Sequence, residues 1–132
     1  MSDEIHLPSA LQGIFFSFRW DKQALWRLPT APQSIPFAEL TWHLDLPIWS
    51  THPPAPLFDL RPRAVIAHPH EHRDHWERIQ AADTTFPIEL FQHNGRWVIM
   101  DGYHRLAKLF VEDTNEILVR MHPDELLPLV KR

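Results

Sequence analysis

One stretch of the 132-residue chain, 86–122, restricts the fold more than any other. Its centre is the dipeptide Asn94-Gly95, which separates the apolar runs 87–91 and 96–100. Both residues tolerate the positive φ of a type I′ turn, and Asn-Gly between apolar runs is the strongest short signal for a β-hairpin. The pattern then predicts a helix over 103–112 and a strand over 116–122. We therefore expect a small sheet with a helix packed against it.

The pentapeptide 101–105 joins the hairpin to this helix and is a candidate binding site. Asp101 is expected at the N-cap, where its carboxylate would accept amide N–H groups of the first turn, and Gly102 allows close approach of the backbone. The unpaired amides and the positive end of the helix dipole favour an anion. An ordinary capped helix with solvated cations is the alternative. The polar side of the helix, with three- or four-residue spacing, contains Asp101, His104, Arg105 and Lys108.

The runs 86–90, 97–108 and 117–120 resemble the N-terminal domain of ParB-like proteins, a superfamily that includes sulfiredoxin and the free-serine kinases. The shared pattern is a helix, a strand beginning Pro-Ile, a hairpin, a Gly-x-His-Arg box that opens a helix, and a final strand. The resemblance covers roughly 68–123. It implies an α+β fold with a small mixed sheet and packed helices. It also implies that Gly102, His104 and Arg105 cradle nucleotide phosphates, to which Gly102 and Tyr103 would offer backbone N–H groups.

Two departures from that family limit the functions it implies. The chain contains no cysteine, so the sulfiredoxin reaction, which uses a cysteine in the box, is excluded. No helix-turn-helix pattern follows the box, and the net charge of −4 is not typical of a broad nucleic-acid surface. We therefore do not expect sequence-specific DNA binding.

The composition indicates one folded domain spanning 1–132. Apolar residues make up 44% of the chain, with six Trp and eight Phe, which is typical of a globule with a sizeable core. No apolar run approaches the length of a membrane span and no signal peptide is recognised, so we expect no membrane association and a cytoplasmic location.

The first 36 residues lie outside the resemblance and predict an N-terminal extension. Apolar side chains alternate over 14–20 and again over 23–28, with Asp21-Lys22 as the turn, which predicts a second β-hairpin. The proline-rich run 29–36 is interpreted as a linker, and 37–40 as one helical turn.

A second motif, 41–49, sets His43 and Asp45 between Trp42 and Trp49. These residues are candidates for one wall of a pocket, in which a Trp ring stacks on a base or sugar and Asp45 holds a hydroxyl or a metal-bound phosphate. The alternative is that both Trp residues are core and Asp45 caps a turn. If this wall belongs to the same site as the box, one of these side chains should lie close to Gly102.

Helices are expected over 62–67 and 70–82. The four histidines His68, His70, His72 and His75 include pairs with helical spacing that can share a metal. Pro69 interrupts the first pair and no cysteine supports a site, so we interpret them as a solvated helix start. The resemblance implies that this helix lies near the box, so we predict that His75 and Arg78, one turn apart, face it.

The leading function is binding of a small phosphorylated ligand, most simply a nucleotide, with phosphotransfer or nucleotide hydrolysis as an associated activity. In that scheme His104 and Arg105 neutralise phosphate charge, and Asp101 or Asp45 acts as base or as Mg²⁺ ligand. The alternative is a non-catalytic module that presents the fold to a protein partner. A nuclease is a third hypothesis, and the absence of a dense carboxylate cluster speaks against it.

Overall fold

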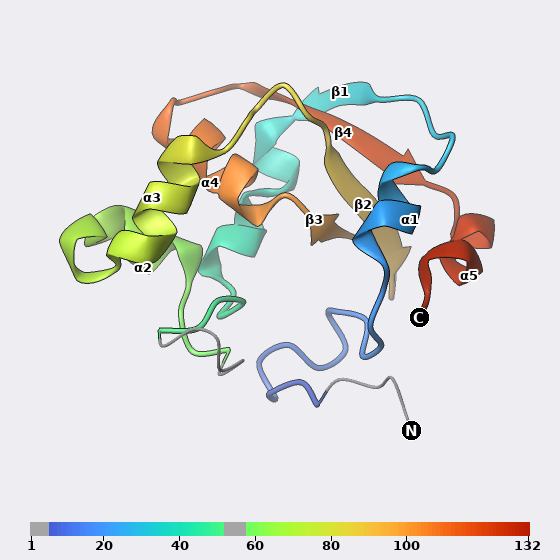
Figure 1. Cartoon of the computed structure of the whole chain (residues 1–132), viewed down its shortest axis with the longest axis horizontal. Coiled ribbons are helices and arrows are strands. Elements are labelled where there is room, and N and C mark those ends of the chain that lie inside the picture. The colour runs from blue at the N-terminus through green and yellow to red at the C-terminus, as the bar shows by residue number, and fades with distance from the viewer. Residues whose placement is uncertain (1–5, 52–57) are drawn as a thin grey trace.

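The structure is a computed structural model that describes residues 6–51 and 58–132, so the first residues of the expected N-terminal extension lie outside it. The described chain is a mixed α+β fold around a four-stranded sheet of order β1-β4-β2-β3 (Figure 1). β2 pairs with β3 and β1 with β4 in antiparallel fashion, whereas β2 and β4 are parallel, so the predicted mixed sheet is confirmed. The strands are β1 (Gln33–Pro36), β2 (Ile88–His93), β3 (Arg96–Asp101) and β4 (Glu116–His122).

The hairpin predicted from Asn-Gly is present between β2 and β3. Asn94 and Gly95 have φ values of 51° and 81°, as a type I′ turn requires, and His93 pairs with Arg96 across the turn. Helix α4 (Tyr103–Val111) follows β3 after a single residue, and the third predicted strand has the bounds of β4. Because α4 crosses over the sheet, β4 returns beside β2 rather than beside β3.

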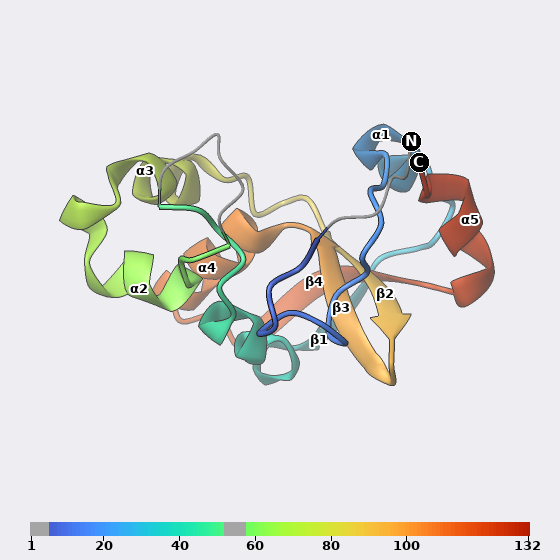
Figure 2. The same ribbon diagram turned by 90° about the horizontal axis from the view of Figure 1, so that it is seen from below.

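Both faces of the sheet are buried, because neighbouring residues of β3 point to opposite cores. Ile99 belongs to a cluster with Leu106 of α4, whereas Val98 and Met100 belong to a cluster with Leu25 of α1. In Figure 2, α2, α3 and α4 gather at one end of the molecule and α1 and α5 at the other. The helices are α1 (Lys22–Trp26), α2 (Pro62–Ala67), α3 (Arg73–Ala81) and α5 (Leu127–Val130).

The predicted N-terminal hairpin is wrong. Residues 22–26 form helix α1, because the Asp21 carboxylate accepts the amide N–H groups of Gln23 and Ala24 and so caps a helix instead of closing a turn. Leu25 and Leu28 are buried three residues apart, a helical spacing that an alternating reading of 23–28 overlooks. Trp20 makes an isolated bridge to Lys131 near the C-terminal helix instead of pairing with 23–28.

The predicted linker 29–36 contains a strand. β1 lies at the edge of the sheet and pairs with β4 alone among the described strands, and an edge strand tolerates Pro36 at its end.

α2 has its predicted bounds, whereas α3 begins three residues later than predicted, after a separate short turn. The helical turn expected at 37–40 is confirmed. Short 3₁₀ helices span Phe37–Glu39, Thr41–Asp45, Pro69–Glu71 and Asp124–Leu126.

Within the described residues, no helix has the length and apolar character that crossing a bilayer requires.

Candidate anion-binding site

Gly102 is the single residue between β3 and α4. Its φ of 122° lies in a region that side chains rarely adopt, and a β-carbon there would lie 2.9 Å from both the Arg105 guanidinium and the Ile88 side chain. Gly102 is the N-cap of α4, so the prediction that Asp101 caps the helix is wrong, and no side chain replaces it. The first amide N–H groups of α4 therefore have no partners within the helix.

The Asp101 carboxylate binds three donors instead. It accepts hydrogen bonds from the Trp26 indole N–H at 2.8 Å and from Arg105 at 3.2 Å, and the Lys22 ammonium lies 3.9 Å away. Asp101 is the last residue of β3, and the extended backbone carries its side chain to α1. A role as base or Mg²⁺ ligand would require it to give up these partners.

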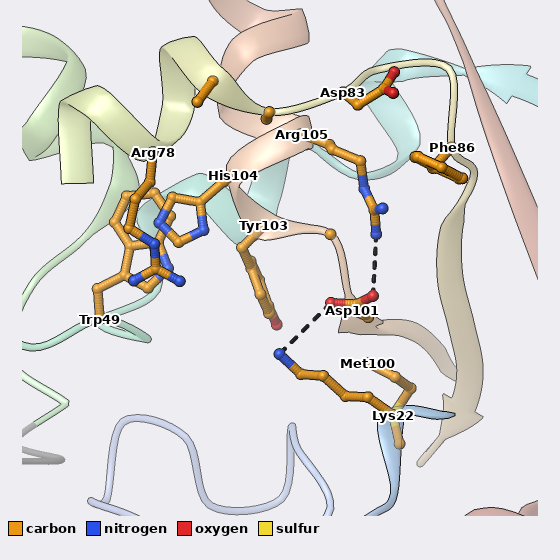
Figure 3. Close-up of a pocket in the computed structure, with 13 residues that line it drawn as sticks. Lys22, Trp49, Arg78, Asp83, Phe86, Met100, Asp101, Tyr103, His104 and Arg105 are labelled. Carbon is orange, nitrogen blue, oxygen red and sulfur yellow. Dashed lines mark hydrogen bonds and ion pairs between the residues drawn. The ribbon is translucent and has the colours of Figure 1, made fainter. Parts of the chain in front are cut away.

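A pocket of about 500 Å³, which we call the α4 pocket, opens at the start of α4 (Figure 3). Cations from three helices line it: Lys22 of α1, Arg78 of α3 and Arg105 of α4. They exceed the two lining carboxylates, Asp83 and Asp101, and the positive end of the α4 dipole adds to the excess. The pocket therefore favours an anion.

The two arginines of the α4 pocket differ in how free they are. Arg78 is exposed and makes no hydrogen bond or ion pair with any residue that the structure describes. The Arg105 side chain is only 16% exposed and is held by Asp101. Its Nε–H is buried and has no hydrogen-bond partner among the described residues. Arg105 is thus part of the pocket wall rather than a solvated cation, and Arg78 is available to a ligand.

Two of the rings that line the pocket, Trp49 and His104, belong to a stack of three. The His104 ring stacks on the Trp49 indole with centroids 4.3 Å apart, and His75 stacks on the same indole at 4.6 Å. Burial, followed by the nearby Arg78, His75 and Lys22, lowers the pKa of His104 to about 3. Burial also lowers the pKa of His75. His104 is therefore neutral at pH 7, which corrects the prediction that it neutralises phosphate charge.

The hydrogen bonds of these histidines fix where their protons lie. His75 Nε2 is 3.0 Å from the Ser50 carbonyl oxygen, which can only accept, so Nε2 carries the proton. The unprotonated Nδ1 of neutral His75 must then accept from His104 Nε2 at 3.3 Å. His104 Nδ1 is left as an acceptor on a residue that lines the pocket. His104 can therefore accept a hydrogen bond from a hydroxyl or amino group of a ligand.

Trp49 is the only member of the second motif that lines the α4 pocket within the described chain. Trp42 lies under the Arg96 guanidinium at 3.7 Å and stacks on His43. His43 is fully buried, where it bonds the Leu40 carbonyl and the Ile99 amide, and burial lowers its pKa to about 4. Asp45 forms an exposed ion pair with Arg63. The predicted ligand roles of Trp42, His43 and Asp45 thus find no support in this geometry.

The predicted ligand residue Lys108 does not line the pocket either. Its ammonium donates to the carbonyl oxygens of Gln80 and Ala82, both at 2.9 Å, at the C-terminal end of α3. One helical turn carries Lys108 from the start of α4 to that helix end, where a cation is favourable. His75 and Arg78 of α3, in contrast, are placed beside the box as predicted. Tyr103 also lines the pocket, and burial raises its pKa well above the usual value.

The sequence reasoning missed a buried polar cluster beside the site. Glu89 of β2 accepts from Arg120 Nε at 2.9 Å and from His122 at 2.6 Å, and all three side chains are buried. Arg120 also donates to the backbone carbonyls of Leu25, near the end of α1, and of Leu28, just after it. The sequence did carry a signal for this cluster, because Glu89, Arg120 and His122 are ionisable residues within strands that were predicted to be largely apolar. Lys22 and Phe86, which also line the α4 pocket, carried no such signal.

No group of three or more His, Cys, Asp or Glu among the described residues is arranged to hold a metal ion. His68 and His70 are exposed, whereas His75 is buried against Trp49, so the four histidines do not form one solvated cluster as interpreted.

Comparisons of the chain with protein-family models, with curated proteins and with solved structures found no match. The resemblance to ParB-like proteins therefore remains a hypothesis, and the functional argument depends on the geometry of this chain.

Proposed function

We propose that the protein binds a small phosphorylated ligand, with the phosphate in the α4 pocket. The observation that carries the proposal is the convergence of Lys22, Arg78 and Arg105, from three different helices, on the pocket at the start of α4. Unpaired amide N–H groups of the first turn and cations in the same cavity are the combination that binds phosphate groups in proteins.

Each lining group has a distinct role in this proposal. Arg78, which has no described partner, forms the ion pair with the phosphate, and Lys22 adds a second charge from the opposite wall (Figure 3). The amides of Tyr103 and His104 donate to phosphate oxygens. His104 Nδ1 accepts a hydrogen bond from a ligand hydroxyl or amino group, which a phosphorylated sugar or nucleotide would supply.

Binding without catalysis is the form of the function that the site favours. Asp101 is occupied by Trp26, Arg105 and Lys22, and Asp45 lies outside the pocket. Asp83, the other lining carboxylate, is held by hydrogen bonds from Thr85. Both lining carboxylates therefore already accept hydrogen bonds, which a role as general base or Mg²⁺ ligand would have to share or displace. Phosphotransfer or nucleotide hydrolysis with Mg²⁺ would extend the proposal from binding to catalysis, and it is tested separately by an activity assay.

A ParB/sulfiredoxin-like fold is part of the same proposal. The order of hairpin, Gly-x-His-Arg box, helix and strand matches the pattern of that superfamily, and a helix, α3, precedes the hairpin. The N-terminal segment with α1 and β1 is an addition to that pattern, and it contributes Lys22 to the site.

Isothermal titration with pyrophosphate and AMP, with and without Mg²⁺, tests the proposal. We expect Arg78→Ala to weaken pyrophosphate binding about tenfold or more, because a hydrogen bond to a charged group contributes about 1.5–3 kcal/mol. Arg73→Ala is the matched control, since Arg73 is exposed on the same helix but does not line the pocket. Added salt should weaken binding to the unaltered protein.

Absence of binding across this panel would overturn the proposal and favour the non-catalytic module for a protein partner. Equal loss in Arg73→Ala and Arg78→Ala would show that only the general charge of α3 matters. Release of phosphate from ATP in the presence of Mg²⁺, abolished by Asp101→Asn, would establish the enzymatic extension.

A further inference from the structure

A second cavity, of about 640 Å³, lies next to the α4 pocket, and we call it the Trp26 pocket. Its walls are largely apolar and include Trp26, Pro32, Phe86 and Pro87, with Glu89 and Arg120 among its other lining residues. Its volume falls in the usual range for small-molecule sites.

The two aromatic side chains of this pocket are unusually exposed. Trp26 is 55% and Phe86 59% exposed, and among the described residues no other Trp, Phe or Tyr is a large exposed hydrophobic side chain. Exposed aromatic rings that line one cavity lose unfavourable contact with water when a ligand covers them. The pair therefore marks a place where an apolar group binds.

The Trp26 wall is held in place before any ligand arrives. The Trp26 indole N–H donates to Asp101 at 2.8 Å, which fixes the orientation of the ring. Arg120 donates to the carbonyl oxygens of Leu25 and Trp26 at 2.9 and 3.2 Å, at the end of α1. Arg120 is itself fixed by buried Glu89. A preformed wall costs little ordering entropy on binding.

Apart from Arg105, the polar groups that line the Trp26 pocket are already hydrogen-bonded. Glu89 is occupied by Arg120 and His122, and the Trp26 N–H by Asp101. A ligand group in this pocket gains mainly stacking and apolar contact, which suits a planar ring rather than a sugar or a charged group.

The two pockets share Phe86 and Arg105, so one ligand can occupy both. Arg105 forms the common wall, and its planar guanidinium can bind phosphate on one side and stack on a ring on the other. We propose that the Trp26 pocket holds the planar aromatic ring of the same ligand whose phosphate occupies the α4 pocket, the ring lying against Trp26 and Phe86. This inference rests on the proposed function and narrows the ligand to a phosphorylated aromatic compound, a class that includes nucleotides.

The test compares 1-naphthyl phosphate with methyl phosphate, two monoesters that differ in the ring. We expect the naphthyl ester to bind about tenfold more tightly, because stacking on an aromatic side chain contributes about 1–3 kcal/mol. Phe86→Ala should remove most of this preference. Trp26→Ala should do the same, while Trp26→Phe, which keeps a ring and loses the N–H, should retain it. Leu129→Ala, an equally exposed apolar residue of α5, is the control and should leave the preference unchanged.

Arg78→Ala should weaken both esters by the same factor, so the preference for the ring and the binding of phosphate are measured separately. If methyl phosphate binds and the naphthyl ester binds no more tightly, the ring inference is wrong and the proposed function stands. A preference that survives Phe86→Ala and Trp26→Ala would place the ring elsewhere and overturn the inference. A dimer in ultracentrifugation that Phe86→Ala dissociates would identify a second copy of the chain as the occupant. Failure of both esters to bind overturns the proposed function together with this inference.

Discussion

The imidazole of His104 lies nearly parallel to the indole of Trp49, with 14° between the ring planes and 4.3 Å between the centroids. This stack joins two motifs that are distant in the sequence, the 41–49 segment and the box at the start of α4. His75 of α3 stacks on the same indole and accepts a hydrogen bond from His104. The stack therefore fixes His104 as a neutral acceptor at the edge of a cationic pocket.

The lowered pKa of His104 predicts how stability depends on pH. In the unfolded chain His104 takes up a proton below about pH 6.5, whereas in the folded chain its pKa is lowered to about 3. Between these values the unfolded state binds more protons, so the free energy of unfolding falls as the pH is lowered. His104→Gln should reduce the slope by up to about 1.4 kcal/mol per pH unit between pH 4 and 6, measured by urea unfolding.

His43 should account for a further part of that slope. Burial lowers its pKa to about 4, so it destabilises the fold in the same direction as the pH falls. His70→Gln is a suitable control because His70 is exposed, and its slope should match that of the unaltered protein. A slope unchanged in His104→Gln would mean that His104 titrates normally in the folded state.

Gly102→Ala should lower the free energy of unfolding by about 1–3 kcal/mol, because the residue must keep a φ of 122° that alanine adopts only with strain. The new β-carbon would also press on Arg105 and Ile88, so phosphate binding should weaken. Gly95→Ala is the matched control, since it too has a positive φ but open space around it. Thermal unfolding of both variants checks this, and a larger loss in Gly95→Ala would contradict the packing argument.

Glu89→Ala should lower the free energy of unfolding by about 3–5 kcal/mol, because it leaves the buried Arg120 guanidinium without its partner. Asp45→Ala breaks an ion pair with Arg63 in which both side chains are largely solvated, and should cost less than about 1 kcal/mol. Urea unfolding at pH 7 compares the two. The Asp45→Ala variant should also bind pyrophosphate with unchanged affinity. Weakened binding would show that Asp45 is a ligand residue after all.

Lys108→Met should destabilise the protein by about 1 kcal/mol, because the ammonium bonds two carbonyl oxygens at the end of α3. Pyrophosphate affinity should remain within about twofold of the unaltered protein, since Lys108 does not line the α4 pocket. A large loss of affinity with unchanged stability would reverse this assignment and make Lys108 a ligand residue.

Part of the site could be found from sequence because its signals are local. Asn94-Gly95 specifies its turn through the φ values that each residue tolerates, and Gly102 specifies the break between strand and helix in the same way. The prediction that His75 faces the box came from the resemblance to ParB-like proteins, which implies that this helix lies near the box. Asp101 was misplaced by one residue, because whether a strand ends at 100 or 101 depends on pairing with β2 and not on the residue itself.

The errors at the N-terminus have one physical cause. A short apolar run can fit the alternation of a strand, as over 14–20, or the spacing of a helix, as for Leu25 and Leu28. Which of the two forms depends on whether a partner strand or a core is there to pack against it. β4 supplies a partner to 33–36, so a proline-rich run became a strand. No strand among the described residues pairs with 23–28, and the Asp21 carboxylate caps a helix that begins at Lys22.

The sequence by itself determined the hairpin, α4 and β4, because their turn and cap residues act on their own backbone over a few positions. It also determined that the start of α4 carries unpaired amides beside Arg105. Only the tertiary structure decided which distant groups meet there. It brought Lys22, Arg78 and Trp49 to the pocket and directed Lys108 to α3, while Asp45 lies outside. Such encounters depend on how helices pack on the two faces of the sheet, which no local spacing encodes.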